Sequence, residues 1–253
     1  MLLLCLRFYK FQITVTVTSV TLAFVSAASN SEEQSVLTPV QLMWVNLIQD
    51  TLAALALATD PPTPDILDRK PDPKSSPLIT SIMWKMIIGQ SFYQVAVTLI
   101  LNFAGRRIFS YGTTTQKAQL ETAVFNTYTW LQIFNQWKYV LDVMDWQCFM
   151  LTINSCRRID NKLNIFEGML RNWLFVAITL IMIGGQIIIM FVGGSAFSVT
   201  RLAGSQWAYS VVLGVMSLLV GALIRWIPLE RLAKWWPHFQ RNDIRGMPID
   251  ELI

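Results

Sequence analysis

The chain alternates between long apolar blocks and polar segments that hold most of its charges. A helix needs about 20 consecutive, mostly apolar residues to span a bilayer, so each long block predicts a membrane-spanning helix. The candidates are Phe11–Ala27, Val40–Thr59, Met86–Ala104, Thr122–Gln136, Trp173–Val192 and Trp207–Ile227. The pattern therefore predicts an all-α membrane protein of about six transmembrane helices. The fourth block is short and polar, so it has to be shielded from lipid inside a bundle.

Proline and glycine set two of the block ends. The Pro-rich segment Asp60–Pro77 cannot continue a helix, so the second block ends near Thr59. The pair Gly193–Gly194 marks the end of the fifth block. The first block has a competing interpretation as a secretory signal that would be cleaved after Ser26–Ala28. Its threonine-rich centre is polar for a signal and its length suffices to span, so a membrane helix is favoured.

Composition supports a membrane protein. The 253 residues are 53% hydrophobic and 14% charged, whereas an average soluble domain has roughly 25% charged residues. The mean hydropathy is +0.44. The net charge is +4, but the basic residues flank the apolar blocks and form no single stripe, which argues against nucleic-acid binding. The three cysteines form no C-x-x-C pair, which argues against structural zinc and a disulfide scaffold.

The basic residues also orient the chain, because cytoplasmic loops of membrane proteins are enriched in Lys and Arg. With a cytoplasmic N-terminus, 16 of the 20 Lys and Arg residues fall on the cytoplasmic side. The four on the opposite side are Arg106, Arg107, Lys117 and Arg201. An even number of spans returns the C-terminus to the first side. The sequence thus predicts a multi-pass protein with both termini in the cytoplasm.

The second block contains a carboxylate, Asp50, and an amide, Asn46, four residues before it. This spacing places both side chains on one face of a helix. A hard cation such as calcium prefers carboxylate, amide and carbonyl oxygens, and a membrane carboxylate usually serves a site or pathway. Asn46 and Asp50 are therefore candidate metal ligands. The alternative is a hydrogen bond between helices at a polar seam.

Other polar residues inside the blocks are expected to join helices by hydrogen bonds. They are Gln90, Gln94, Asn126, Asn135 and Gln186. Gln132 is singled out as a further candidate ligand, because its short polar block must lie inside the bundle.

No catalytic group is indicated. The sequence has no G-x-x-x-x-G-K phosphate loop, and its single histidine, His238, follows the last block. The basic, Trp-containing stretch Arg231–Arg241 has the composition of a calmodulin target or a surface helix. Anchoring beside a final span is the favoured interpretation, so calmodulin is not an expected partner. The chain alone is not expected to hydrolyse a substrate.

Several stretches, in order, carry a resemblance to one family. QLMWVNLIQDTLAALALATDPPTPDILDRKP, which starts at Gln41, looks like the sixth membrane helix and following loop of P-type calcium-transporting ATPases. The similarity is to the plasma-membrane-type subfamily that includes fungal vacuolar pumps. RFYKFQITV and FNTYTWLQIFNQ resemble the entry to the fifth helix and the eighth helix. INSCRRIDNKLNIFEG and GGSAFSVTRLAGSQW resemble the following loop and the link between the last two helices.

The resemblance implies the last six helices of such a pump, with Asn46 and Asp50 at ion-ligand positions. Thr16 stands where the family usually has Asn, and Thr16 and Gln132 are further candidate ligands. Calcium is the implied transported ion. ATP and magnesium would act only through domains absent from this chain, which also lacks the D-K-T-G and P-E-G-L-P motifs. The family's calcium site is therefore expected to be incomplete here.

The resemblance divides the chain into a C-terminal transmembrane domain of a cation-transporting P-type ATPase, residues 7–228, and a cytoplasmic tail, residues 229–253. Residues 137–152 are interpreted as an insertion, because IFNQ would join INSCRRIDNK directly in the family pattern.

The function expected from this resemblance is the C-terminal membrane half of a calcium pump, with the vacuolar membrane favoured over the plasma membrane. The expected partners are the lipid bilayer, calcium and the remaining pump domains. The alternative is a truncated, non-catalytic membrane partner of a full-length pump or of another membrane protein.

Overall fold

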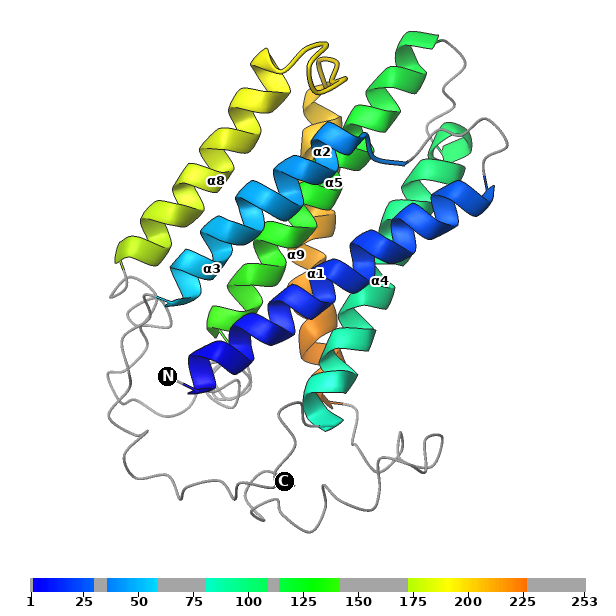
Figure 1. Cartoon of the computed structure of the whole chain (residues 1–253). Coiled ribbons are helices and arrows are strands. Elements are labelled where there is room, and N and C mark those ends of the chain that lie inside the picture. The colour runs from blue at the N-terminus through cyan, green and yellow to red at the C-terminus, as the bar shows by residue number, and fades with distance from the viewer. Residues whose placement is uncertain (1, 30–35, 59–80, 109–113, 142–172, 227–253) are drawn as a thin grey trace, which may run out of the picture.

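The computed structural model describes residues 2–29, 36–58, 81–108, 114–141 and 173–226, and every regular element in them is a helix (Figure 1). The elements are α1 (Leu2–Ser29), α2 (Pro39–Met43), the π-helical η1 (Trp44–Gln49), α3 (Asp50–Ala58), α4 (Ser81–Ile108), α5 (Thr114–Leu141), α8 (Trp173–Val192) and α9 (Gly204–Trp226). Each predicted block is helical where it is described. The prediction of an all-α membrane protein is confirmed.

Within the described residues, four helices are long and apolar enough to cross a membrane. Their spanning parts are Tyr9–Ala28, Met83–Gly105, Trp173–Val192 and Gly204–Ile224. The other two predicted blocks are also helical, but they are not among these four spans. The second block is divided among α2, η1 and α3, and α5 contains many polar residues.

Helix α5 is the centre of the bundle. It contacts α1, α4, α8 and α9, and every residue from Thr122 to Ile133 is buried. Figure 1 shows α8 and α4 on opposite sides of the bundle, with α5 and α9 between them. This burial explains how a polar helix is tolerated in a membrane, because its neighbours separate it from lipid. The helix begins before the predicted Thr122 and continues to Leu141, so it includes the first part of the predicted insertion.

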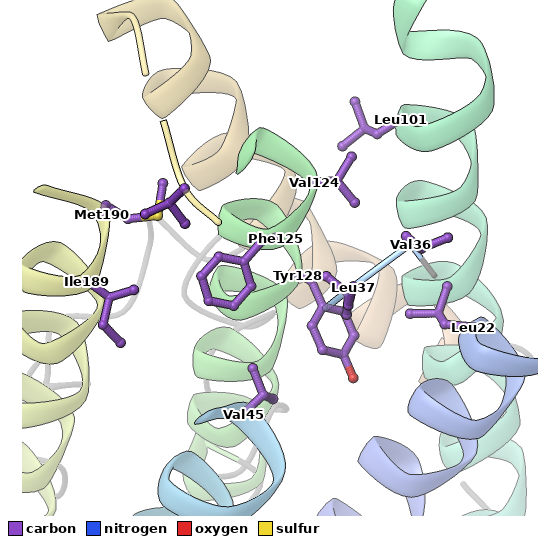
Figure 2. Packing of buried hydrophobic residues seen from close by; sticks show 11 residues of the cluster. Leu22, Val36, Leu37, Val45, Leu101, Val124, Phe125, Tyr128, Ile189 and Met190 are labelled. Carbon is purple, nitrogen blue, oxygen red and sulfur yellow. The ribbon is translucent and has the colours of Figure 1, made fainter. Parts of the chain in front are cut away.

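An apolar cluster joins the helices around α5. Leu22 of α1, Val45 of η1, Leu101 of α4 and Met190 of α8 pack around Phe125 and Tyr128 of α5 (Figure 2). The outer faces of the helices are also apolar, as expected for a surface that meets lipid. Three examples with more than two thirds of their surface exposed are Phe24, Phe92 and Val192.

Several buried polar side chains hold the helices together. Gln90, Gln94, Asn126 and Gln186 do so as the sequence predicted, whereas Asn135 has no hydrogen-bond partner among the described residues. Gln90 Nε2 donates to the Ser217 carbonyl at 3.3 Å, which joins α4 to α9. Thr127 Oγ1 donates to Ser210 Oγ at 3.0 Å, which joins α5 to α9. Such bonds between membrane helices contribute roughly 0.6 kcal/mol each on average. They fix the neighbours of α5 and so define the space around the second block.

Candidate cation-binding site

The second block is helical but irregular at the position of its polar residues. Thr38 and Gln41 form a capping box that starts α2, with Pro39 at its first turn. The π-helical η1 follows, and the Asp50 backbone N–H donates to the Val45 carbonyl, five residues earlier. Single π-helical turns inside α-helices occur often at functional sites. Here the turn lies directly before the carboxylate.

Asp50 is the buried acidic residue of the candidate site. Its side chain is 5% exposed, and Gln12 Nε2 on α1 donates to its Oδ2 atom at 3.3 Å. Its Oδ1 atom is buried and has no hydrogen-bond partner among the described residues. A buried carboxylate with an unused oxygen is costly unless a cation or donor compensates it. This geometry leaves one carboxylate oxygen for a ligand.

Asn46 lies one turn away, toward the start of η1, and is exposed. Ser19 Oγ on α1 donates to its Oδ1 atom at 3.3 Å. The same Ser19 hydroxyl lies 2.8 Å from the Tyr128 hydroxyl of α5. The amide oxygen of Asn46 is therefore held toward α1 and keeps a second lone pair.

Helix α1 thus holds both predicted ligands. Gln12 and Ser19 are seven residues apart, which places them on one face of α1, about two turns from each other. Gln12 contacts Asp50, and Ser19 contacts Asn46. Neither Gln12 nor Ser19 was singled out from the sequence. Their seven-residue spacing was visible there, but only the tertiary contact shows which helix they face.

Gln132 also lies in this region. It is 1% exposed, and its Nε2 atom donates to Gln94 Oε1 of α4 at 3.1 Å. Thr18 Oγ1 donates to the same Gln94 oxygen at 3.2 Å. The Gln132 Oε1 atom is buried without a hydrogen-bond partner among the described residues. Gln132 lies one turn after Tyr128 on α5 and its side chain contacts the Tyr128 hydroxyl, so Gln132 belongs to the same seam.

Thr16 is placed differently from the other candidates. Its side chain is exposed, whereas Thr14, Thr18 and Ser19 of the same helix are buried. The structure therefore brings Asn46, Asp50 and Gln132 into one seam around Ser19 and Tyr128, and leaves Thr16 on another face of α1.

All the candidate ligand atoms in this seam are oxygens. No group of three or more His, Cys, Asp or Glu residues with metal-binding geometry occurs in the described part of the chain. The seam offers Asp50 Oδ1, Gln132 Oε1 and the amide oxygen of Asn46. Calcium takes about 6–8 oxygen ligands, so these three groups fit part of a site for a hard cation and would require further oxygens.

The fold and its buried carboxylate define a multi-pass helical membrane protein with an ionisable group among its membrane helices. The chain belongs to the family described as "Cation transporting ATPase, C-terminus", whose sequence model matches residues 34–140 and 147–227. The region between the two matched parts falls within the predicted insertion, which stays a prediction.

Relatives extend the family match over nearly the whole chain. "Calcium-transporting ATPase 2" of Schizosaccharomyces pombe is 54% identical over 231 residues, which are 91% of this chain and 16% of that protein. "Calcium-transporting ATPase 2" of Saccharomyces cerevisiae is 42% identical over 241 residues, 91% of this chain and 20% of that protein. "Plasma membrane calcium-transporting ATPase 1" of Gallus gallus is 42% identical over 233 residues, 89% and 18% respectively. The chain spans a fifth or less of the length of these relatives.

Proposed function

We propose that this chain supplies part of the calcium-binding site of a P-type calcium-transporting ATPase, with Asp50 and Asn46 as ligands. The single observation that carries the proposal is the unpartnered Asp50 Oδ1, buried directly after a π-helical turn. The names of the relatives support calcium as the ion. Gln132 is proposed as a third ligand, because its buried carbonyl oxygen is also unpartnered. Thr16 is not proposed as a ligand, because its side chain is exposed on another face of α1.

The proposed role is binding and scaffolding. The chain holds one carboxylate and amide oxygens but too few ligands to satisfy calcium by itself. The remaining ligands, and the use of ATP and magnesium, would come from domains outside this sequence. In this arrangement the helices described here change calcium exposure when those domains are phosphorylated, and the chain alone transports nothing.

The proposal extends to subfamily and location. The likeness to fungal calcium-transporting ATPases and to a plasma membrane pump supports the plasma-membrane-type subfamily. The distribution of Lys and Arg supports cytoplasmic termini. We place the protein in the vacuolar membrane on the strength of its resemblance to fungal vacuolar pumps.

A chimeric pump tests the ligand role. In it, this chain replaces the matched 231-residue region of the Schizosaccharomyces pombe relative, and phosphorylation from ATP is measured against calcium concentration. Asp50→Asn should abolish calcium-stimulated phosphorylation, because the amide carries no charge to balance the cation. Glu121→Gln is the matched control, since it removes a carboxylate from an exposed Lys117 pair 3.9 Å long. Normal calcium dependence in Asp50→Asn would reject the proposal.

Experiments on the chain expressed alone test the alternative function, that of a truncated, non-catalytic membrane partner. If the proposed function is correct, we expect the isolated chain to show no calcium-dependent ATPase activity. Co-purification of the isolated chain with an intact pump, together with a change in that pump's calcium response, would favour a non-catalytic membrane partner.

A further inference from the structure

The π-helical turn before Asp50 contacts helix α8 through a tryptophan side chain. Trp44 is the first residue of η1, and its indole lies over Gly185 of α8. A Cβ atom built at Gly185 would lie 2.8 Å from Cη2 and 3.1 Å from Cζ2 of Trp44. Real side chains essentially never approach that closely, so only glycine allows this contact without a shift. The indole therefore packs directly against the α8 backbone.

Next to Gly185, helix α8 is itself bonded to helix α5. The residue after Gly185, Gln186, is fully buried, and its Nε2 atom donates to Asn126 Oδ1 of α5 at 3.2 Å. Ile189 and Met190 of α8 belong to the apolar cluster against which Trp44 packs. Trp44 is thus held between the core and α8. Trp44 is partly buried, and a methyl group at Gly185 would have to displace the part of its ring that meets α8.

The conformation of η1 depends on such support. A π-helical turn is rare and, unlike an α-helical turn, is not favoured by the backbone itself. No Gly or Pro occurs from Trp44 to Gln49, so nothing in the local sequence imposes the irregular turn. Packing of Trp44 on α8 is a tertiary contact at the first residue of this turn.

We propose that Gly185 is a positioning residue for the cation site, acting through Trp44 to hold η1 in the conformation that aims Asn46 and Asp50 at α1. This inference rests on the proposed function of Asn46 and Asp50. The contacts from Ser19 to Asn46 and from Gln12 to Asp50 are both 3.3 Å long. That length is already beyond the usual range for hydrogen bonds, so a shift of a few tenths of an ångström breaks them.

The neighbouring glycine supplies a matched control. A Cβ atom at Gly184 would meet nothing within 4 Å. Gly184→Ala and Gly185→Ala make the same chemical change at adjacent positions of one helix, and both raise helix propensity by a similar amount. Only the second places a methyl group against Trp44. A difference between the two variants therefore reports the Trp44 contact.

The experiment uses the chimeric pump and compares the calcium concentration for half-maximal phosphorylation. Gly185→Ala should raise it about 10-fold, since misplacing groups by about 1 Å can cost up to ~100-fold. Gly184→Ala should leave it within about twofold. Adding Trp44→Phe to Gly185→Ala should restore calcium affinity, because the shorter ring leaves room for the methyl group. The Trp44 Nε1 atom has no hydrogen-bond partner among the described residues, so this change removes no bond.

The outcomes separate the two proposals. Equal calcium affinities in the two glycine variants would overturn the role of Gly185, and so would a Gly185→Ala defect that Trp44→Phe does not reduce. A loss of folded Gly185→Ala pump that Trp44→Phe restores supports the contact. Calcium dependence that survives Asp50→Asn would overturn the proposed function instead, because that variant leaves the glycine and tryptophan intact.

Discussion

Helix α5 has polar seams on two of its faces, and they differ in what they can bind. The α1 seam consists of Gln12, Ser19, Asn46, Asp50, Tyr128 and Gln132, and the α8 seam consists of Asn126 and Gln186. Both seams are buried at α5, and both contain an amide oxygen with no hydrogen-bond partner among the described residues. Only the α1 seam has a carboxylate and an irregular helix beside it.

The proposed cation site therefore rests on more than buried polarity, which the two seams share. In the α8 seam, two neutral amides on regular helices donate and accept between themselves, which is enough to fix the helices. In the α1 seam, a carboxyl group keeps one buried oxygen without a hydrogen-bond partner among the described residues. In the proposed site the carboxylate attracts the cation, and the amide and hydroxyl oxygens orient it.

The largest expected difference in calcium affinity is between variants of Gln132 in the α1 seam and of Gln186 in the α8 seam. Gln132 and Gln186 each donate to an amide oxygen, at 3.1 Å and 3.2 Å, and each keeps an unpartnered Oε1 atom. In the chimeric pump, Gln132→Leu should raise the calcium concentration for half-maximal phosphorylation about 10- to 100-fold. That range corresponds to the ~1.5–3 kcal/mol of a bond to a charged group.

Gln186→Leu is the control for this prediction. It also removes a buried amide, but we expect calcium affinity to stay within about threefold, because leucine preserves most of the volume that holds α8 in place. Equal effects of the two variants would mean that the seams do not differ in function.

A smaller effect should separate two hydroxyl residues of α1. Ser19→Ala removes the contacts to Asn46 and Tyr128, so it should weaken calcium binding about fivefold, as expected for the loss of about 1 kcal/mol. Thr16→Ala alters an exposed side chain and should change calcium affinity less than twofold. The measurement is again calcium-dependent phosphorylation. A larger effect at Thr16 than at Ser19 would make Thr16 the functional hydroxyl of this helix.

The sequence predicted the helices well because apolar blocks of spanning length have few other uses. The four-residue spacing predicted that Asn46 and Asp50 lie on one face of a helix. In the structure Asn46 is exposed and Asp50 is buried after a π-helical turn, although each contacts a residue of α1. The prediction of Gln132 as a buried residue followed from the polarity of its block, and the structure places it inside the bundle.

Other features were not predictable from local sequence. Nothing in WVNLIQ signals a π-helical turn, since the turn depends on where Trp44 packs. The roles of Gln12 and Ser19 require knowing which face of α1 meets η1, and hydrophobic periodicity is weak in a helix whose outer face is also apolar. Pairing between helices is a tertiary property, and single-helix patterns do not contain it.

The smallest expected effect concerns the Tyr128 hydroxyl, the group through which the α1 seam reaches α5. Tyr128→Phe removes the group that lies 2.8 Å from Ser19 Oγ, so Ser19 loses one of the two contacts that orient it toward Asn46. Calcium affinity of the chimeric pump should fall about threefold, in line with ~0.5–1 kcal/mol for a neutral hydrogen bond. Tyr93→Phe is the matched control, because the Tyr93 hydroxyl donates to the Leu213 carbonyl at 3.0 Å and joins α4 to α9. It should lower stability to heat in detergent without changing calcium affinity, and a calcium defect as large as that of Tyr128→Phe would show that any lost hydroxyl bond in the bundle weakens the site.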